Sequence, residues 1–118
     1  MDNPFSDPDA AITLAARYLE SAGFRVLERT WRTGSGELGI AAADRHVFVA
    51  CEVRTRSSTQ PGTPAAMISK AGIRRLRRLA MAWINAHGMR FDRVRIDIIT
   101  LIWDGPGGYT TEHLRGVG

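Results

Sequence analysis

Residues 36–56, GELGIAAADRHVFVACEVRTR, place Glu37 and Glu52 fifteen positions apart, with Arg54 two positions after Glu52. Metal-dependent hydrolysis of a phosphodiester needs converging carboxylates, because Mg²⁺ takes oxygen ligands. The bound metal lowers the pKa of its water and offsets the charge that develops on phosphate. Glu52 is therefore the predicted metal ligand, and Glu37 and Arg54 are the candidate catalytic side chains beside it. Glu52 has a purely structural alternative, an ion pair with Arg54, Arg56 or Arg32.

Two predicted strands position these side chains. Residues 38–43 and 46–55 are separated only by Asp44-Arg45, which favours an antiparallel hairpin. A period of two puts Glu52 and Arg54 on one face of the second strand. Its other face carries Val47, Val49, Cys51 and Val53. In the first strand, Glu37, Gly39 and Ala41 are expected to share a face.

The rest of the chain supplies the elements around this hairpin. Residues 9–23 predict a helix and residues 24–31 a strand. A second helix is expected from an N-cap at Thr63 with Pro64 at its first position, and it runs to about His87. Two further strands follow at 93–103, predicted to be central, and 109–114, predicted to be an edge. The order αβββαββ predicts an α/β fold with a central mixed sheet flanked by helices, and the length predicts a single domain over residues 1–118.

Composition narrows the class of protein. The net charge is +4, and Lys70 is the only lysine among sixteen basic residues. This bias has two readings, the codon usage of a GC-rich genome or selection for Arg as a bidentate phosphate ligand. No apolar run approaches the ~18–20 residues of a membrane span, and the N-terminus does not resemble a signal peptide. With its lone Cys51, the chain is expected to be cytoplasmic, with no membrane partner.

The segment KAGIRRLRRLAMAWI separates into two faces at helical spacing. The apolar face is formed by Ile73, Leu76, Leu79, Ala80, Trp83 and Ile84. The basic face is formed by Lys70, Arg74, Arg77 and Arg78, with Arg75 at its flank. Such a stripe attracts a phosphate backbone without reading sequence, and Arg56 is expected to extend it. The alternative is an ordinary solvated helix face.

Several segments together resemble the YraN family of uncharacterised bacterial proteins. The matching segments are AARYLESAGFRVLERTWRTGSGELGIAA, VFVACEVRTRS, KAGIRRLRRLA, RFDRVRIDIITL and EHLRGVG. The resemblance implies a restriction-endonuclease-like fold related to the Holliday-junction resolvases. It also implies DNA as partner, Mg²⁺ as cofactor if the site is active, and a possible homodimer.

The chain departs from the family pattern at the residues expected to carry catalysis. Gly39 stands where the family has Asp, Arg54 where it has Lys, and Ala11-Ile12 where it has Gly-Glu. Glu37 lies two residues from Gly39, about 6.6–6.8 Å along a strand, so it is a poor substitute. Arg54 can bind phosphate but cannot act as a base.

The predicted function is therefore DNA binding by an endonuclease-like protein with a degraded catalytic centre. Two alternatives stay open: an active metal-dependent endonuclease that uses Glu52, and a protein-interaction module with a basic helix.

Three other features have structural readings. Asp97 is expected to form a buried ion pair with Arg95 or with a helix cation. Cys51 is expected to be a small buried apolar side chain. The three histidines, His46, His87 and His113, have no metal-ligand spacing with one another or with the cysteine.

Overall fold

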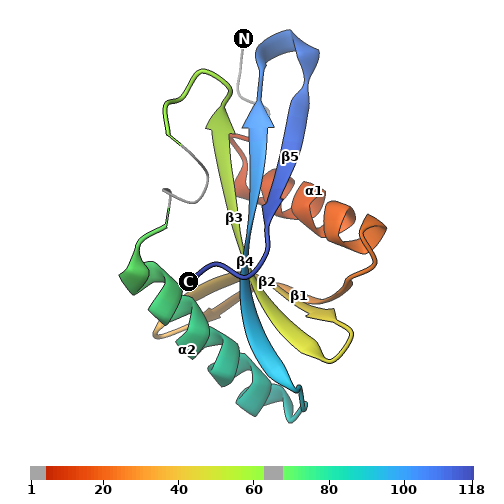
Figure 1. Cartoon of the computed structure of the whole chain (residues 1–118), viewed down its shortest axis with the longest axis vertical. Helices are drawn as coiled ribbons and strands as arrows, with labels where there is room; N and C mark the ends of the chain where they lie inside the picture. The colour runs from red at the N-terminus through yellow and green to blue at the C-terminus, as the bar shows by residue number, and fades with distance from the viewer. Residues whose placement is uncertain (1–4, 63–67) are drawn as a thin grey trace.

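The structure is a computed structural model that describes residues 5–62 and 68–118, and it shows a five-stranded sheet with a helix on either face (Figure 1). In chain order the elements are α1 (Pro8–Ser21), β1 (Arg25–Thr33), β2 (Gly36–Asp44), β3 (Val47–Ser57), α2 (Lys70–His87), β4 (Arg93–Trp103), the 3₁₀ turn η2 (Gly105–Gly107) and β5 (Tyr109–Leu114). The predicted order αβββαββ is confirmed. The arrangement is consistent with a restriction-endonuclease-like fold.

The sheet is mixed, with spatial order β1-β2-β3-β4-β5. Only β3 and β4 run parallel, and they pair without interruption from Val47↔Arg93 to Ser57↔Trp103. Helix α2 makes the crossover between them, as a parallel connection requires. The strand predicted to be central, β4, is interior but lies beside the middle strand β3. The predicted edge strand 109–114 is confirmed as β5.

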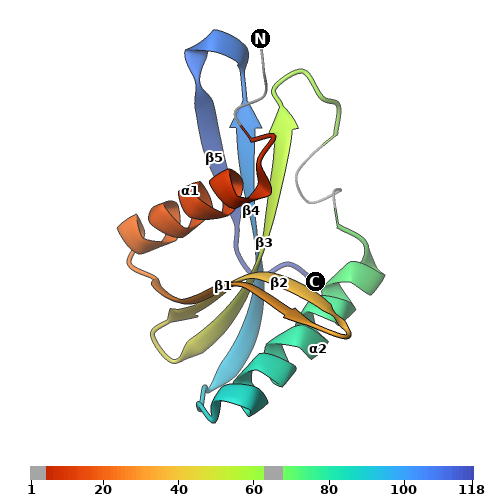
Figure 2. The same cartoon turned by 180° about the vertical axis from the view of Figure 1, so that it is seen from behind.

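Each helix covers one face of the sheet and closes its own core. Helix α1 lies against the face of the sheet opposite to α2 (Figure 2). There Ala15 and Leu19 pack against Val49, Cys51 and other strand residues. On the α2 side, Leu76, Leu79, Ala80 and Trp83 pack against Phe48, Ala50 and Ile96. The predicted apolar face of α2 and the burial of Cys51 are thereby confirmed. On the same face of β3 as Cys51, Val49 is buried, whereas Val47 and Val53 are only half-buried.

The second helix begins later than predicted. Its N-cap is Ser69, whose Oγ accepts a hydrogen bond from the Gly72 amide, and Gly88 ends it in the left-handed conformation (φ 62°). The predicted start at Thr63 and Pro64 lies outside the described residues. No helix in the described part of the chain is long and apolar enough to cross a membrane.

The expectation that Gly39 and Ala41 share a face is wrong. A Cβ on Gly39 would lie 3.4 Å from Ile12 Cδ1, on the α1 side, whereas Ala41 packs in the α2 core. The alternation of side chains between the two faces of β2 changes at Gly39, because the pairing of β2 with β1 is interrupted there. Thr30, opposite Gly39 in β1, has a φ of 51°, and neither residue has a partner in the β1–β2 register. Such a backbone is strained for a β-branched residue.

Candidate functional site

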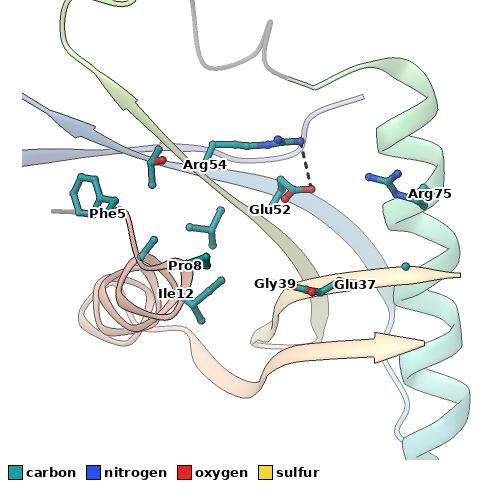
Figure 3. Close-up of a pocket in the computed structure, with 12 residues that line it drawn as sticks. Phe5, Pro8, Ile12, Glu37, Gly39, Glu52, Arg54 and Arg75 are labelled. Atoms are coloured by element: carbon teal, nitrogen blue, oxygen red, sulfur yellow. Dashed lines mark ion pairs between the residues drawn. The ribbon is translucent and has the colours of Figure 1, made fainter. Parts of the chain in front are cut away.

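A cavity of about 640 Å³ opens where the N-terminal end of α1, the start of β2, the middle of β3 and α2 converge (Figure 3). Phe5, Pro8, Ala11 and Ile12 line one side, and Arg75 from α2 lines the other. The strands contribute Gly36, Glu37, Gly39, Glu52, Val53, Arg54 and Thr55. The tertiary structure therefore brings the three predicted catalytic residues, Glu37, Glu52 and Arg54, to one cavity.

Glu52 lies between the two sides of this cavity (Figure 3). Its Oε2 is 3.8 Å from Nη2 of Arg54, a long ion pair, and its side chain is only 20% exposed. Burial raises the pKa of Glu52, and the neighbouring Arg54 and Arg75 only partly oppose this effect. Of the structural partners considered for Glu52, the structure selects Arg54.

Glu37 lines the cavity but is paired elsewhere. Its Oε2 accepts a hydrogen bond of 2.8 Å from Nε of Arg32, and both side chains are well exposed. This hydrogen bond raises the pKa of Arg32. Arg32 therefore forms its ion pair with Glu37. The alternative from the sequence, an ion pair of Arg32 with Glu52, is not formed.

The space beside Gly39 is closed by backbone and by an apolar side chain. A Cβ at this position would lie 3.3 Å from the Cys51 carbonyl oxygen and 3.4 Å from Ile12 Cδ1. Among residues 5–62 and 68–118, no group of three or more His, Cys, Asp or Glu side chains lies close enough together to hold a metal ion. The donors around Glu52 therefore do not fit Mg²⁺, which needs several oxygen ligands.

A second hollow, of about 580 Å³, adjoins the first and shares Arg54 and Arg75 with it. Arg78 and the residues at the start of α2 complete its lining: Ile68, Ser69, Ala71 and Gly72. The Nε of Arg54 is buried and has no hydrogen-bond partner among the described residues. Arginines and a helix N-terminus at one hollow make it attractive to anions.

Arg75 lines both the cavity around Glu52 and the adjoining hollow, a role that its position in the sequence did not indicate. Helical spacing in the sequence predicts a position only at the flank of the basic face. Its side chain instead reaches across β2, where a Cβ on Gly36 would lie 3.6 Å from Arg75 Cδ. The signal available in the sequence was its spacing of three residues from Arg78, on the same side of the helix.

The predicted basic stripe is solvent-exposed: Lys70, Arg74, Arg77 and Arg78 all lie on the open face of α2. Arg77 makes one weak contact, in which its Nη2 donates to the Gly118 carbonyl at 3.4 Å. Arg56 does not extend the stripe as predicted. It is 8% exposed, and its guanidinium donates to the carbonyl of Gln60, so it holds the loop after β3.

Asp97 of β4, paired in register with Cys51 of β3, lies at the centre of a buried polar network. Arg95 donates to both of its oxygens at 2.9 and 3.0 Å, His113 Nε2 lies 2.8 Å away, and the Gly116 amide donates at 3.0 Å. Burial alone would raise the pKa of Asp97, but these hydrogen bonds outweigh it and hold the pKa below 3.8. The predicted buried ion pair of Asp97 with Arg95 is confirmed. The alternative partner, a cation from a helix, is not found among the described residues that contact Asp97; its other partners are His113 and the backbone amide of Gly116.

Comparison with known proteins places the chain in a family. The pattern of the uncharacterised protein family UPF0102 matches residues 13–101. The chain belongs to this family. It is 45% identical to a UPF0102 protein of Arthrobacter sp. (strain FB24) over 105 residues, covering 89% of each chain.

Two further relatives agree with this assignment to UPF0102. The chain is 41% identical to a UPF0102 protein of Nocardioides sp. over 106 residues, covering 90% of this chain and 86% of the relative. It is 46% identical to a UPF0102 protein of Streptomyces coelicolor over 107 residues, covering 89% and 82%. The YraN-like resemblance is therefore confirmed. The UPF0102 description names no activity, so a function has to be argued from the chemistry of the site.

Proposed function

We propose that this UPF0102 protein binds nucleic acid, with DNA as the expected partner, through the basic face of α2, and that its endonuclease-like centre no longer cleaves. The observation that carries the proposal is the exposure of Lys70, Arg74, Arg77 and Arg78 on α2, the helix that also contributes Arg75 to the cavity around Glu52. The donor set of that cavity does not fit a metal. The chain therefore has the groups for phosphate binding but lacks those for metal-dependent hydrolysis.

The electrostatics of α2 support backbone binding. Lys70, Arg74, Arg75, Arg77 and Arg78 lie within residues 70–78, with no acidic residue among them. The buried residues of the same helix, Leu76, Leu79, Ala80 and Trp83, pack against the sheet, so packing does not require these cations. Guanidinium groups along one helix face concentrate positive potential and form bidentate bonds with phosphate oxygens. Contacts of this kind position a protein on DNA without reading its sequence.

The proposal is tested by measuring DNA binding against salt concentration. Replacing Arg74, Arg77 and Arg78 together by Ala is expected to flatten the slope of log affinity against log salt by up to about 2–3 units, since each phosphate contact contributes about −0.9. A matched control replaces three exposed arginines that lie away from α2, Arg17, Arg25 and Arg29, and removes the same charge. The control is expected to keep nearly all of the wild-type slope.

Two outcomes would overturn the proposal. If the two triple variants have the same slope, the affinity follows net charge alone and the stripe is a solvated face. If wild-type protein cuts single-stranded, duplex or branched DNA with Mg²⁺ or Mn²⁺, and Glu52→Gln abolishes the cutting, the centre is active.

A further inference from the structure

The cavity beside Glu52 is large. Two of its lining residues, Ile12 and Gly39, stand where the family pattern has carboxylates. Its volume of about 640 Å³ lies in the range of small-molecule pockets, roughly 300–1,000 Å³. Pro8 and Ile12 form one wall (Figure 3). Val53 of β3 also lines the cavity. Ile12 lies over Gly39, so the end where a metal would need carboxylates is now apolar.

The opposite end of the same cavity is polar and cationic. Arg54 and Arg75 line it together with Glu52, and both arginines also line the adjoining hollow at the start of α2. The Arg54 side chain is 37% exposed and its ion pair with Glu52 is long, at 3.8 Å, so its terminal nitrogens can donate to a ligand in the cavity. An apolar hollow next to two guanidinium groups matches one ligand chemistry, a flat hydrophobic ring attached to a phosphate.

We propose that this cavity binds one unpaired nucleotide of the nucleic acid, with the base against Pro8, Ile12 and Val53 and its phosphate on Arg54 and Arg75. The inference rests on the proposed function and names its substrate class, a strand with unpaired bases. A base inside a duplex cannot enter such a pocket without leaving its stack, which costs free energy that an unpaired base does not have to supply. Thr55, on the same face of β3 as Val53, is the polar group that meets the edge of the base.

The experiment compares single-stranded DNA of about 12 nucleotides with the blunt duplex of the same sequence, at one salt concentration. Wild-type protein is expected to bind the single strand about tenfold more tightly per phosphate. Thr55→Phe fills the cavity from β3 without changing charge and is expected to remove this preference. Its matched control is Thr110→Phe, on exposed β5, which adds the same ring away from the cavity. Circular dichroism checks folding, and Ile12→Phe fills the cavity from α1 if Thr55→Phe does not fold.

A competition experiment distinguishes binding of the phosphate from binding of the base. Free deoxyadenosine monophosphate is expected to displace the single strand at lower concentration than inorganic phosphate or deoxyadenosine does. The proposal is overturned if the filled variant and its control keep the same single-strand preference, or if inorganic phosphate competes as well as the nucleotide. The wild-type duplex affinity and its salt slope report the proposed function separately, so the two ideas can fail independently.

Discussion

At the scale of single residues, Glu52 is the side chain whose charge matters most to the site. Its pKa is raised by burial from an ordinary value of 4.5, so the folded chain holds the proton of this carboxyl more firmly than the unfolded chain does. Ionisation therefore costs stability. The cost grows as the pH rises from the ordinary pKa through the raised one, and it is fully present above it.

Glu52→Gln removes this cost and is expected to raise Tm near neutral pH. The gain should shrink as the pH falls below the ordinary pKa, because both proteins are then neutral at this position. Thermal unfolding across a pH series measures it. Glu20→Gln, an exposed change on α1, serves as control and should shift stability by less than about 0.5 kcal/mol. A lower Tm for Glu52→Gln at neutral pH would contradict the assignment of burial as the dominant effect.

Asp97 shows the opposite behaviour, since its pKa is lowered and its ionised form stabilises the fold. Its contribution is present above its ordinary pKa of 3.8 and is lost as the pH falls through the lower folded value. Asp97→Asn is expected to destabilise the protein by at most about 3–5 kcal/mol at neutral pH, because it removes the buried carboxylate of the pair while Arg95 keeps Asp44, 3.0 Å from its Nη1. Denaturant unfolding measures this, with the exposed Asp104→Asn as control. Equal stability of the two variants would refute the role of the network.

At the scale of elements, α2 has two tasks that lie on separate faces. Trp83 represents the packing face. It is 2% exposed, its ring lies 5.2 Å from that of Phe48, and its Nε1 donates to Glu28 Oε1 at 2.8 Å. These contacts tie the helix to β3 and β1 together, while the basic face stays open.

Trp83→Ala is expected to cost about 3–5 kcal/mol of unfolding free energy, the usual range for a truncated core aromatic. Met81→Ala on the same helix, where Met81 is 50% exposed, should change stability by no more than about 0.5 kcal/mol. Chemical denaturation followed by far-ultraviolet circular dichroism compares the two variants. A small effect of Trp83→Ala would mean that α2 is held mainly by other contacts.

At the scale of the whole molecule, the cavity exists only because α1, β2, β3 and α2 meet there. The same geometry predicts that Gly39→Asp and Arg54→Lys together do not complete a metal site. An Asp at position 39 would meet Ile12, whose Cδ1 lies 3.4 Å from the position of its Cβ. Ile12→Glu removes this apolar wall and adds a third carboxylate from α1.

The triple change Ile12→Glu, Gly39→Asp and Arg54→Lys is expected to bind Mn²⁺ and to cleave DNA with added metal, because it supplies converging oxygen ligands and a lysine. The double change without Ile12→Glu should bind metal more weakly. Calorimetry with Mn²⁺ and a cleavage assay measure the two properties, and adding Glu52→Gln to the triple variant should abolish cleavage. A folded triple variant that binds no metal would show that the cavity has lost more than its ligands.

Local sequence patterns and tertiary contacts determine different features of this protein. Local patterns in the sequence determined the elements: alternation gave the strands, and the two-faced spacing in residues 70–84 gave the helix that covers the sheet. The facing of Glu52 and Arg54 followed from the period of two, and the buried pair of Asp97 with Arg95 followed from charges within an apolar strand. The single domain over residues 1–118 stays a prediction.

Only the tertiary structure decided what surrounds Glu52. The slip of alternation at Gly39 depends on Thr30 in the neighbouring strand, and no pattern within β2 contains it. The burial of Arg56 depends on the loop after β3, the pairing of Glu37 on Arg32, and the reach of Arg75 on the packing of α2 across β2. These are contacts between segments distant in sequence or across a strand boundary. Periodicity reports which face a side chain takes, but only packing fixes which partner it meets there.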